Sequence, residues 1–213
     1  MNLKIAPSIL SADRKKLQSE VAQVEPYSDL IHVDIMDGKF VPPTTFSPAE
    51  IKSIRTRLPK DVHLMVDYPL ADKHIDRFIA AGASIITIHQ ECKDDLLECI
   101  KYIKLKGAMP SLAIRPKTPL ETILLYLRKV DMVLIMSVEP GYAGQAFMPA
   151  VLQKVRELRD IRKDMDIEID GGITTQTIKD AVSAGANVIV AASAVFGKND
   201  RKQAILDLRN ACK

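Results

Sequence analysis

The stretch "LIHVDIMDGKF", residues 30–40, has the pattern of a buried strand, yet it places polar side chains inside that strand. Successive side chains of a β-strand point to opposite faces of the sheet. One face of this run is apolar, and the opposite face carries His32, Asp34 and Met36. A histidine and a carboxylate are costly to bury unless they are paired or bind a ligand. The stretch therefore predicts a strand with one packing face and one chemical face.

Seven further short runs of apolar and β-branched residues occur along the chain, and longer amphipathic segments separate them. Such runs are typical of strands, and the amphipathic segments are typical of helices. The predicted strands are residues 4–10, 30–36, 62–66, 85–89, 110–114, 132–138, 167–171 and 188–193. The predicted helices include residues 47–58, 70–82, 118–130 and 174–186.

This regular alternation of strand and helix predicts an α/β fold with a parallel sheet. Eight units favour closure into a (β/α)8 TIM barrel, a single domain spanning residues 1–213. The alternative is an open doubly wound sheet, but no G-x-G-x-x-G turn follows the first predicted strand. Local signals agree with the helices, since Ser47 and Glu50 predict a capping box and Gly82 and Gly185 stand where helices should end.

The composition restricts the class of protein. Hydrophobic residues make up 47% of the 213 residues and charged residues 27%, with a net charge of +3, which suits one sizeable core. Basic residues are interleaved with acidic ones, which argues against a nucleic-acid partner. No apolar run approaches the length of a membrane span or resembles a signal peptide, and the three cysteines argue against a disulfide framework. We therefore expect a cytoplasmic protein with no membrane partner.

Polar side chains recur near the ends of other predicted strands. His63 lies in "VHLMV", and Asp170 ends "IEID". Because the carboxyl ends of barrel strands surround the active site, these groups should meet the polar face of residues 30–36. Either histidine alone is better explained as a hydrogen-bonded core residue. Four such groups converging from three strands, however, favour a site for a divalent cation such as Zn²⁺, Mn²⁺, Fe²⁺ or Co²⁺. The four are His32, Asp34, His63 and Asp170.

Glycine-rich and small residues follow the last three predicted strands. The loops contain "EPGYAGQ" at residues 139–145, "DGGI" at residues 170–173 and "AAS" at residues 191–193. Small residues let backbone N–H groups approach an anion, and the loops after strands seven and eight often bind phosphate in such barrels. Each loop alone is only a turn, but the three in succession predict a phosphate site.

Six motifs follow one another along the chain, namely "SILSAD", "HVDIMDGKFVP", "HLMV", "MSVEPGYAGQAF", "DGGI" and "GANVIVAASAVF". In the order and spacing of these motifs, the chain resembles the ribulose-phosphate 3-epimerases along nearly its whole length. The resemblance implies a (β/α)8 barrel isomerase that interconverts D-ribulose 5-phosphate and D-xylulose 5-phosphate in the pentose phosphate pathway. Its substrate would then be a small phosphosugar. We also expect a homo-oligomer.

The resemblance also implies roles for individual residues. His32, Asp34, His63 and Asp170 would bind one divalent metal ion, with Zn²⁺ favoured over Fe²⁺, Mn²⁺ and Co²⁺. Asp34 and Asp170 would be the catalytic acid/base pair, and Ser8 and His63 match substrate-contacting positions. The positions that match the phosphate cradle are Gly141, Tyr142, Ala143, Gly144, Gly171, Gly172, Ala192 and Ser193.

The chemistry of the residues agrees with this reaction. Inverting a carbon beside a ketone requires removing a proton from one face and returning a proton to the other. Asp34 and Asp170 lie on predicted strands that are well apart around the ring, so they can approach from different sides. A metal ion would stabilise the enediolate charge. Three methionines either line this intermediate or fill the barrel core, namely Met36, Met65 and Met136.

The chain departs from the family pattern at four positions. Ala143 and Ala192 stand where glycines are usual, and Pro43 and Arg115 stand where asparagines are usual. Alanine keeps the N–H donor but makes positive φ and close approach harder, so substrate preference and phosphate affinity stay open.

Two rival functions remain, an epimerase for a ketohexulose 6-phosphate such as D-allulose 6-phosphate and a barrel that only binds a phosphosugar. A related decarboxylase is disfavoured because "DIMDGK" lacks the D-x-K-x-x-D pattern. One structural expectation is separate from the chemistry. Lys4 and Glu168 lie on the first and seventh predicted strands, and we expect them to pair in the interior.

Overall fold

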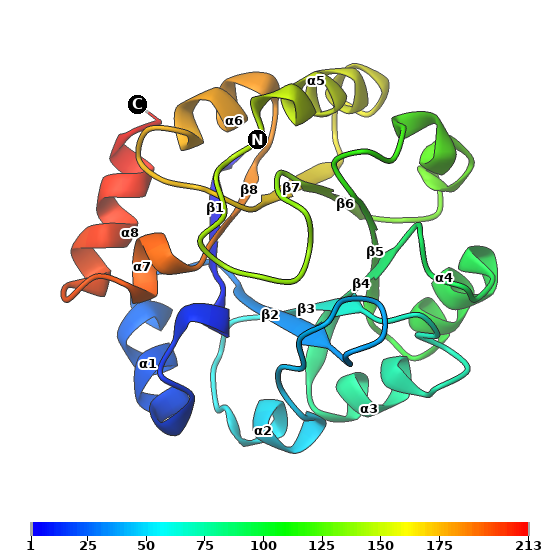
Figure 1. The fold of residues 1–213 in the computed structure, drawn as a ribbon, viewed down its shortest axis with the longest axis horizontal. Coiled ribbons are helices and arrows are strands. Elements are labelled where there is room, and N and C mark those ends of the chain that lie inside the picture. Colours follow the sequence, from blue (N-terminus) through cyan, green and yellow to red (C-terminus); the bar gives the residue numbers. More distant parts are fainter. Residues whose placement is uncertain (1, 213) are drawn as a thin grey trace.

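In the computed structural model, which describes residues 2–212, eight parallel strands form one barrel (Figure 1). The hydrogen-bonded order is β1-β8-β7-β6-β5-β4-β3-β2, so each strand from β2 to β7 pairs with the next strand in the chain, and β8 also pairs with β1. The predicted (β/α)8 architecture is confirmed. The strands are β1 Lys4–Pro7, β2 Ile31–Met36, β3 Lys60–Met65, β4 Ala83–His89, β5 Met109–Ile114, β6 Met132–Met136, β7 Asp166–Asp170 and β8 Val188–Ala191.

The helices form an outer ring around the strands (Figure 1). The capping box predicted at Ser47 and Glu50 is present, and Gly185 ends its helix with φ +116°. Gly82 follows the end of another helix with φ +95°. The α-helices are α1 Leu17–Val24, α2 Pro48–Ser53, α3 His74–Ala80, α4 Leu96–Leu105, α5 Leu152–Ile161, α6 Ile178–Ala184, α7 Ser193–Phe196 and α8 Arg201–Asn210. Among residues 2–212, no helix combines the length and the apolar character needed to cross a membrane.

One predicted helix differs from the structure. Residues 118–130 do not form an α-helix, because Leu120–Tyr126 form a 3₁₀ helix, η4, in the corresponding place. The segment begins after Pro119 and contains the β-branched pair Thr122 and Ile123, which lowers its preference for an α-helix. Short 3₁₀ segments are common connectors of this kind.

The barrel is closed by a seam between β1 and β2. Ser8 and His32 form a single parallel bridge there. Below this bridge Asp29 takes the place of a strand partner, since its N–H donates to the Ile5 carbonyl (3.0 Å) and its carboxylate accepts the Ile5 N–H (2.8 Å). Arg209 of α8 binds the same carboxylate at 2.5 Å. The last helix therefore supports the closure between the first two strands.

The Asp29 carboxylate predicts a measurable effect on stability. In Asp29→Ala the Ile5 N–H loses its side-chain acceptor, and Arg209 loses its ion-pair partner. Leaving a buried donor without a partner costs about 1–3 kcal/mol. Urea unfolding should therefore show a free energy of unfolding lower by about that amount. The surface variant Asp164→Ala, whose side chain is 82% exposed, is the control and should be nearly unchanged.

The expected pairing of Lys4 with Glu168 is wrong. Lys4 instead binds Asp166 at 2.6 Å, where both side chains keep partial contact with solvent. The long lysine chain lets its ammonium group reach the rim rather than enter the interior, which avoids a large desolvation cost. Glu168 does point inward and is fully buried, but its neighbours are Asp61 and His32.

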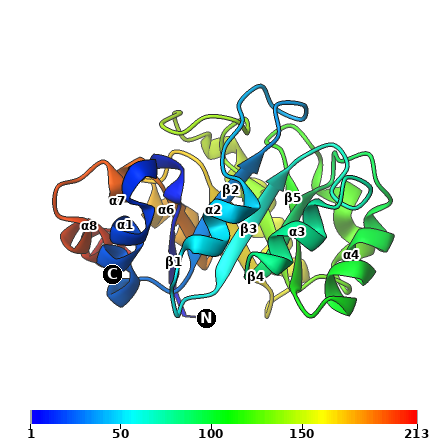
Figure 2. The same ribbon diagram turned by 90° about the horizontal axis from the view of Figure 1, so that it is seen from below.

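The loops after β2 and β6 lie at one end of the barrel, opposite the N-terminus (Figure 2). The loop after β6, yellow-green in Figure 1, crosses over the opening of the ring. This end is the carboxyl end of the strands, where active sites of (β/α)8 barrels lie.

Candidate metal centre and phosphate cradle

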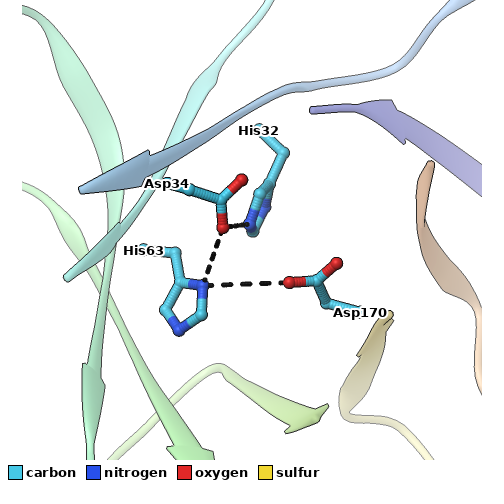
Figure 3. Close-up of side chains that lie close together, drawn as sticks. All are labelled: His32, Asp34, His63 and Asp170. Carbon is cyan, nitrogen blue, oxygen red and sulfur yellow. Dashed lines mark hydrogen bonds and ion pairs between the residues drawn. The ribbon is translucent and has the colours of Figure 1, made fainter. Parts of the chain in front are cut away.

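Four predicted residues converge at the carboxyl end of the barrel. His32 and Asp34 come from β2, His63 from β3 and Asp170 from the end of β7 (Figure 3). One ligand atom of each lies within 4.8 Å of the others. Asp34 lies between the two imidazoles, with its Oδ1 3.5 Å from His32 Nε2 and 3.3 Å from His63 Nδ1. His63 Nδ1 is also 4.0 Å from Asp170 Oδ2.

Two carboxylates contact the side of the His32 ring that faces away from the cluster. Its Nδ1 lies 2.7 Å from the Asp61 carboxylate and 3.4 Å from Glu168. Its Nε2 faces the cluster and has no hydrogen-bond partner among residues 2–212, although it is buried. In the neutral ring, with Nδ1–H donating to Asp61, the lone pair lies on Nε2. This nitrogen is therefore available as a metal ligand.

Asp34 is held by Ser8, the residue that directly follows β1. Ser8 donates its hydroxyl to Asp34 Oδ2 at 2.5 Å, so that Oδ1 is the oxygen facing the histidines. Burial alone would raise the pKa of Asp34, but its interactions with His32 and His63 outweigh burial and lower the pKa below its usual range. The structure thus gives Ser8 a direct contact with the cluster.

Asp170 lies in a different electrostatic environment. Its side chain is 16% exposed, and burial together with the neighbouring Asp34 carboxylate raises its pKa to about 6. Two carboxylates at one site thus differ in proton affinity, the usual arrangement when one group holds a proton while the other is ionised.

The geometry of the four residues fits a divalent metal ion. With metal–ligand distances of about 2.1 Å, neighbouring ligand atoms of a tetrahedral site lie roughly 3.4 Å apart. The distances around Asp34 Oδ1, 3.5 and 3.3 Å, are of this size. The buried Nε2 of His32, which has no other partner in the described chain, points to the same conclusion. Two nitrogens and two carboxylate oxygens suit a borderline cation.

The predicted cradle residues line two adjoining cavities. A small cavity of about 40 Å³ lies over the carboxylates and is bounded by Gly141–Gly144, Ser8 and the three methionines. A second cavity of about 290 Å³ is lined by Gly144, Gly171, Gly172, Ala192 and Ser193. The cavities share Gly144, Asp170, Gly171 and Ala192. The side chain of Tyr142, in contrast, is 62% exposed.

Two of these glycines are required by close packing of the loops after β6 and β7. A Cβ atom on Gly171 would lie 2.5 Å from a Val138 side-chain carbon, and one on Gly172 would lie 2.4 Å from the Phe147 backbone nitrogen. Both glycines also have positive φ, +119° and +63°. The "DGGI" loop is therefore shaped by contact with its neighbour as well as by any ligand.

Sequence reasoning assigned no role to three polar residues around the cluster, Asp61, His89 and Glu91, and it paired a fourth, Glu168, with Lys4. Asp61 and Glu168 support His32, while His89 at the end of β4 lies 2.8 Å from His63 and 2.9 Å from Glu91. Asp61 and His89 could have been found by the rule that identified His63, since both lie on the polar face of a predicted or adjoining strand. Arg115, which stands where asparagine is usual in the family, lies over the Phe40 ring, with its guanidinium carbon 4.2 Å from the ring centroid.

The chain matches the model of the ribulose-phosphate 3 epimerase family over residues 4–196. It is 42% identical to ribulose-phosphate 3-epimerase from Bacillus subtilis (strain 168), with 98% of this chain and 99% of that protein covered. It is 44% identical to ribulose-phosphate 3-epimerase from Schizosaccharomyces pombe, with 98% and 93% covered.

Among solved structures, 3-hexulose-6-phosphate synthase from Salmonella typhimurium gives a TM-score of 0.73 at 17% identity, covering 99% of this chain and 98% of that one. At this identity the likeness concerns the barrel fold alone. The sequence matches go further, because they cover nearly the whole chain at more than 40% identity. The predicted resemblance is confirmed, and this chain belongs to the ribulose-phosphate 3-epimerase family.

Proposed function

We propose that the chain interconverts D-ribulose 5-phosphate and D-xylulose 5-phosphate by moving the proton at C3, with Asp34 and Asp170 as the acid/base pair. One observation carries this proposal beyond family membership. The two carboxylates reach one cluster from β2 and β7, and His63 lies between their oxygens at 3.3 and 4.0 Å. A planar enediolate bound there would have one carboxylate at each face.

The proposed mechanism gives each of these residues a separate role. The lowered pKa of Asp34 keeps this carboxylate ionised, whereas Asp170, with a pKa of about 6, can hold a proton near neutral pH. Their roles exchange with the direction of the reaction. His32, Asp34, His63 and Asp170 would hold the metal ion, which, when bound, supplies positive charge to the oxygens of the substrate. Ser8 keeps Asp34 oriented.

The experiment that tests this function measures metal and turnover together. The metal content of gently purified protein is determined, and epimerisation of ribulose 5-phosphate is assayed before chelation, after chelation and after return of Zn²⁺, Fe²⁺, Mn²⁺ or Co²⁺. We expect activity to fall on chelation and to return with a metal, Zn²⁺ being the first choice for this donor set. Parallel assays with D-allulose 6-phosphate test the rival hexulose substrate. If neither sugar is turned over, the remaining alternative is a barrel that only binds a phosphosugar.

The cavity lined by the loops after β6, β7 and β8 predicts a strong preference for phosphorylated substrate. If these backbones bind the phosphate, its binding energy helps to position the reacting carbon. D-ribulose should therefore have a kcat/KM far below that of D-ribulose 5-phosphate. Added inorganic phosphate should inhibit the second reaction competitively. Comparable kcat/KM values for the two sugars would exclude the cradle.

The compartment and assembly of the protein are also part of the proposal. Its three cysteines are free thiols, as suits a reducing cytoplasm. We further propose a homo-oligomer, because three large apolar side chains around η4 and α5 are exposed at 41%, 83% and 52%, namely Leu124, Leu125 and Ile161. Light scattering of the purified protein measures its mass directly.

A further inference from the structure

A chain of three side chains leads away from the metal centre through the interior of the barrel. His63 Nε2 lies 2.8 Å from Nε2 of His89, at the end of β4. The other nitrogen of His89, Nδ1, lies 2.9 Å from Glu91 Oε2. Both imidazoles are fully buried. Neither His89 nor Glu91 belongs to the four residues of the proposed metal site.

The positions of the protons follow from these contacts. An ionised carboxylate only accepts hydrogen bonds, so Glu91 requires the proton of His89 on Nδ1. In neutral His89 the lone pair then lies on Nε2. Two imidazole nitrogens 2.8 Å apart share one proton, so His63 must carry N–H on Nε2 and donate it to His89. The lone pair of His63 is therefore on Nδ1, the atom that faces Asp34 Oδ1 and Asp170 Oδ2.

Glu91 is itself held in place. Its Oε1 accepts the Arg115 N–H at 3.0 Å and a short hydrogen bond from the Thr118 hydroxyl. The Phe40 ring packs against His89, with the ring centroids 4.8 Å apart, and the Arg115 guanidinium group lies over the Phe40 ring. These contacts fix Glu91 as the acceptor of the His89 Nδ1–H.

We propose that His89 and Glu91 are positioning residues that hold His63 in its Nε2–H tautomer, so that its Nδ1 is the metal-binding atom. The inference rests on the proposed function only in naming a metal as the ligand of that atom. His32 has the opposite tautomer, because its Nδ1–H donates to Asp61 and Nε2 is left for the metal. The two histidines thus bind through different nitrogens, each selected by a carboxylate, directly for His32 and through the imidazole of His89 for His63.

Three variants separate the tautomer from simple packing. His89→Phe keeps an aromatic ring but removes the acceptor for His63. In Glu91→Gln, the amide oxygen stays with the two donors at Oε1, so its NH₂ group faces His89 and reverses the proton order along the chain. His89→Gln can accept from His63 and donate to Glu91, and it therefore keeps the order. His74→Phe on α3 and Glu121→Gln on η4 are the matched controls.

The first measurement is the Kd for Zn²⁺ and Co²⁺, obtained by competition with a chelator in variants shown to be folded. Loss of a partner that orients a metal-binding histidine typically costs about 10–100-fold in affinity. We expect a loss of this size in His89→Phe and Glu91→Gln, and affinities close to the parent protein in His89→Gln and both controls. Equal losses in His89→Phe and His89→Gln would show a packing effect and overturn the proposal.

The second measurement uses metal-free protein labelled with ¹⁵N in its four histidines. At a pH where the imidazoles are neutral, the nitrogen chemical shifts report which ring atom carries the proton. We expect Nε2–H on His63 in the parent protein and a change of that tautomer in Glu91→Gln. Nδ1–H on His63 of the parent protein would refute the inference. This result does not depend on catalysis, so failure of the proposed function and failure of the inference are distinguishable.

Discussion

Asp34→Asn and Asp170→Asn are each expected to lose epimerisation by about 10²–10⁴-fold, the usual contribution of a general acid or base. Asparagine keeps the shape of the side chain and one oxygen but can no longer carry the proton. If each carboxylate serves one face of the enediolate, neither can replace the other. Net inversion therefore needs both, and the two single variants should show losses of similar size.

Proton exchange separates the two roles. Each variant is loaded with metal, its occupancy is measured, and exchange at C3 is followed in ²H₂O from ribulose and xylulose 5-phosphates separately. The surviving aspartate should still exchange the proton of one epimer. Near-normal exchange of both epimers in either variant would contradict the two-carboxylate mechanism. Asp164→Asn, at an exposed position before β7, serves as the control and should keep both activities.

His32→Ala and His63→Ala are expected to lose bound metal and with it most activity. Each substitution removes one of two nitrogen ligands, and the one histidine and two carboxylates that remain match a borderline cation less well. A bound metal contributes several kcal/mol to stabilising charge in such transition states. The loss in kcat should therefore approach that of the chelated parent protein.

The folded state of these variants must be shown in the same experiment, because both histidines are buried. Far-UV circular dichroism should retain the spectrum of an α/β barrel, and His74→Ala provides a histidine outside the cluster for comparison. Metal analysis then decides the question. Full occupancy in both His32→Ala and His63→Ala would remove the proposed ligand set, whatever happened to activity.

Much of this protein was predictable because the relevant signals are local in sequence. Strand alternation in residues 30–36 placed His32 and Asp34 on one face, and the same rule applied to His63 and Asp170. Repetition of eight strand–helix units indicated a closed parallel barrel, which then brings the carboxyl ends of all strands to one mouth. The reaction was inferred from the motifs shared with the family.

Two predictions made from the sequence were wrong. Residues 120–126 form a 3₁₀ helix where the apolar spacing favoured an α-helix. Lys4 pairs with Asp166 rather than Glu168, because its ammonium group lies at the rim beside a partly solvated carboxylate. The strand pattern predicts which face a side chain occupies, but the direction of a long side chain depends on where solvent lies.

Tertiary structure alone decided which atoms meet. The seam between β1 and β2 is completed by Asp29 and by Arg209, which is 180 residues away in the chain. The contact between His63 and His89 depends on the stagger between β3 and β4, where the register shifts near Lys60 and Asp61. Alternation and propensity act within a strand, whereas ligand atoms and tautomers are fixed between strands by distances of about 3 Å that only closure of the barrel sets.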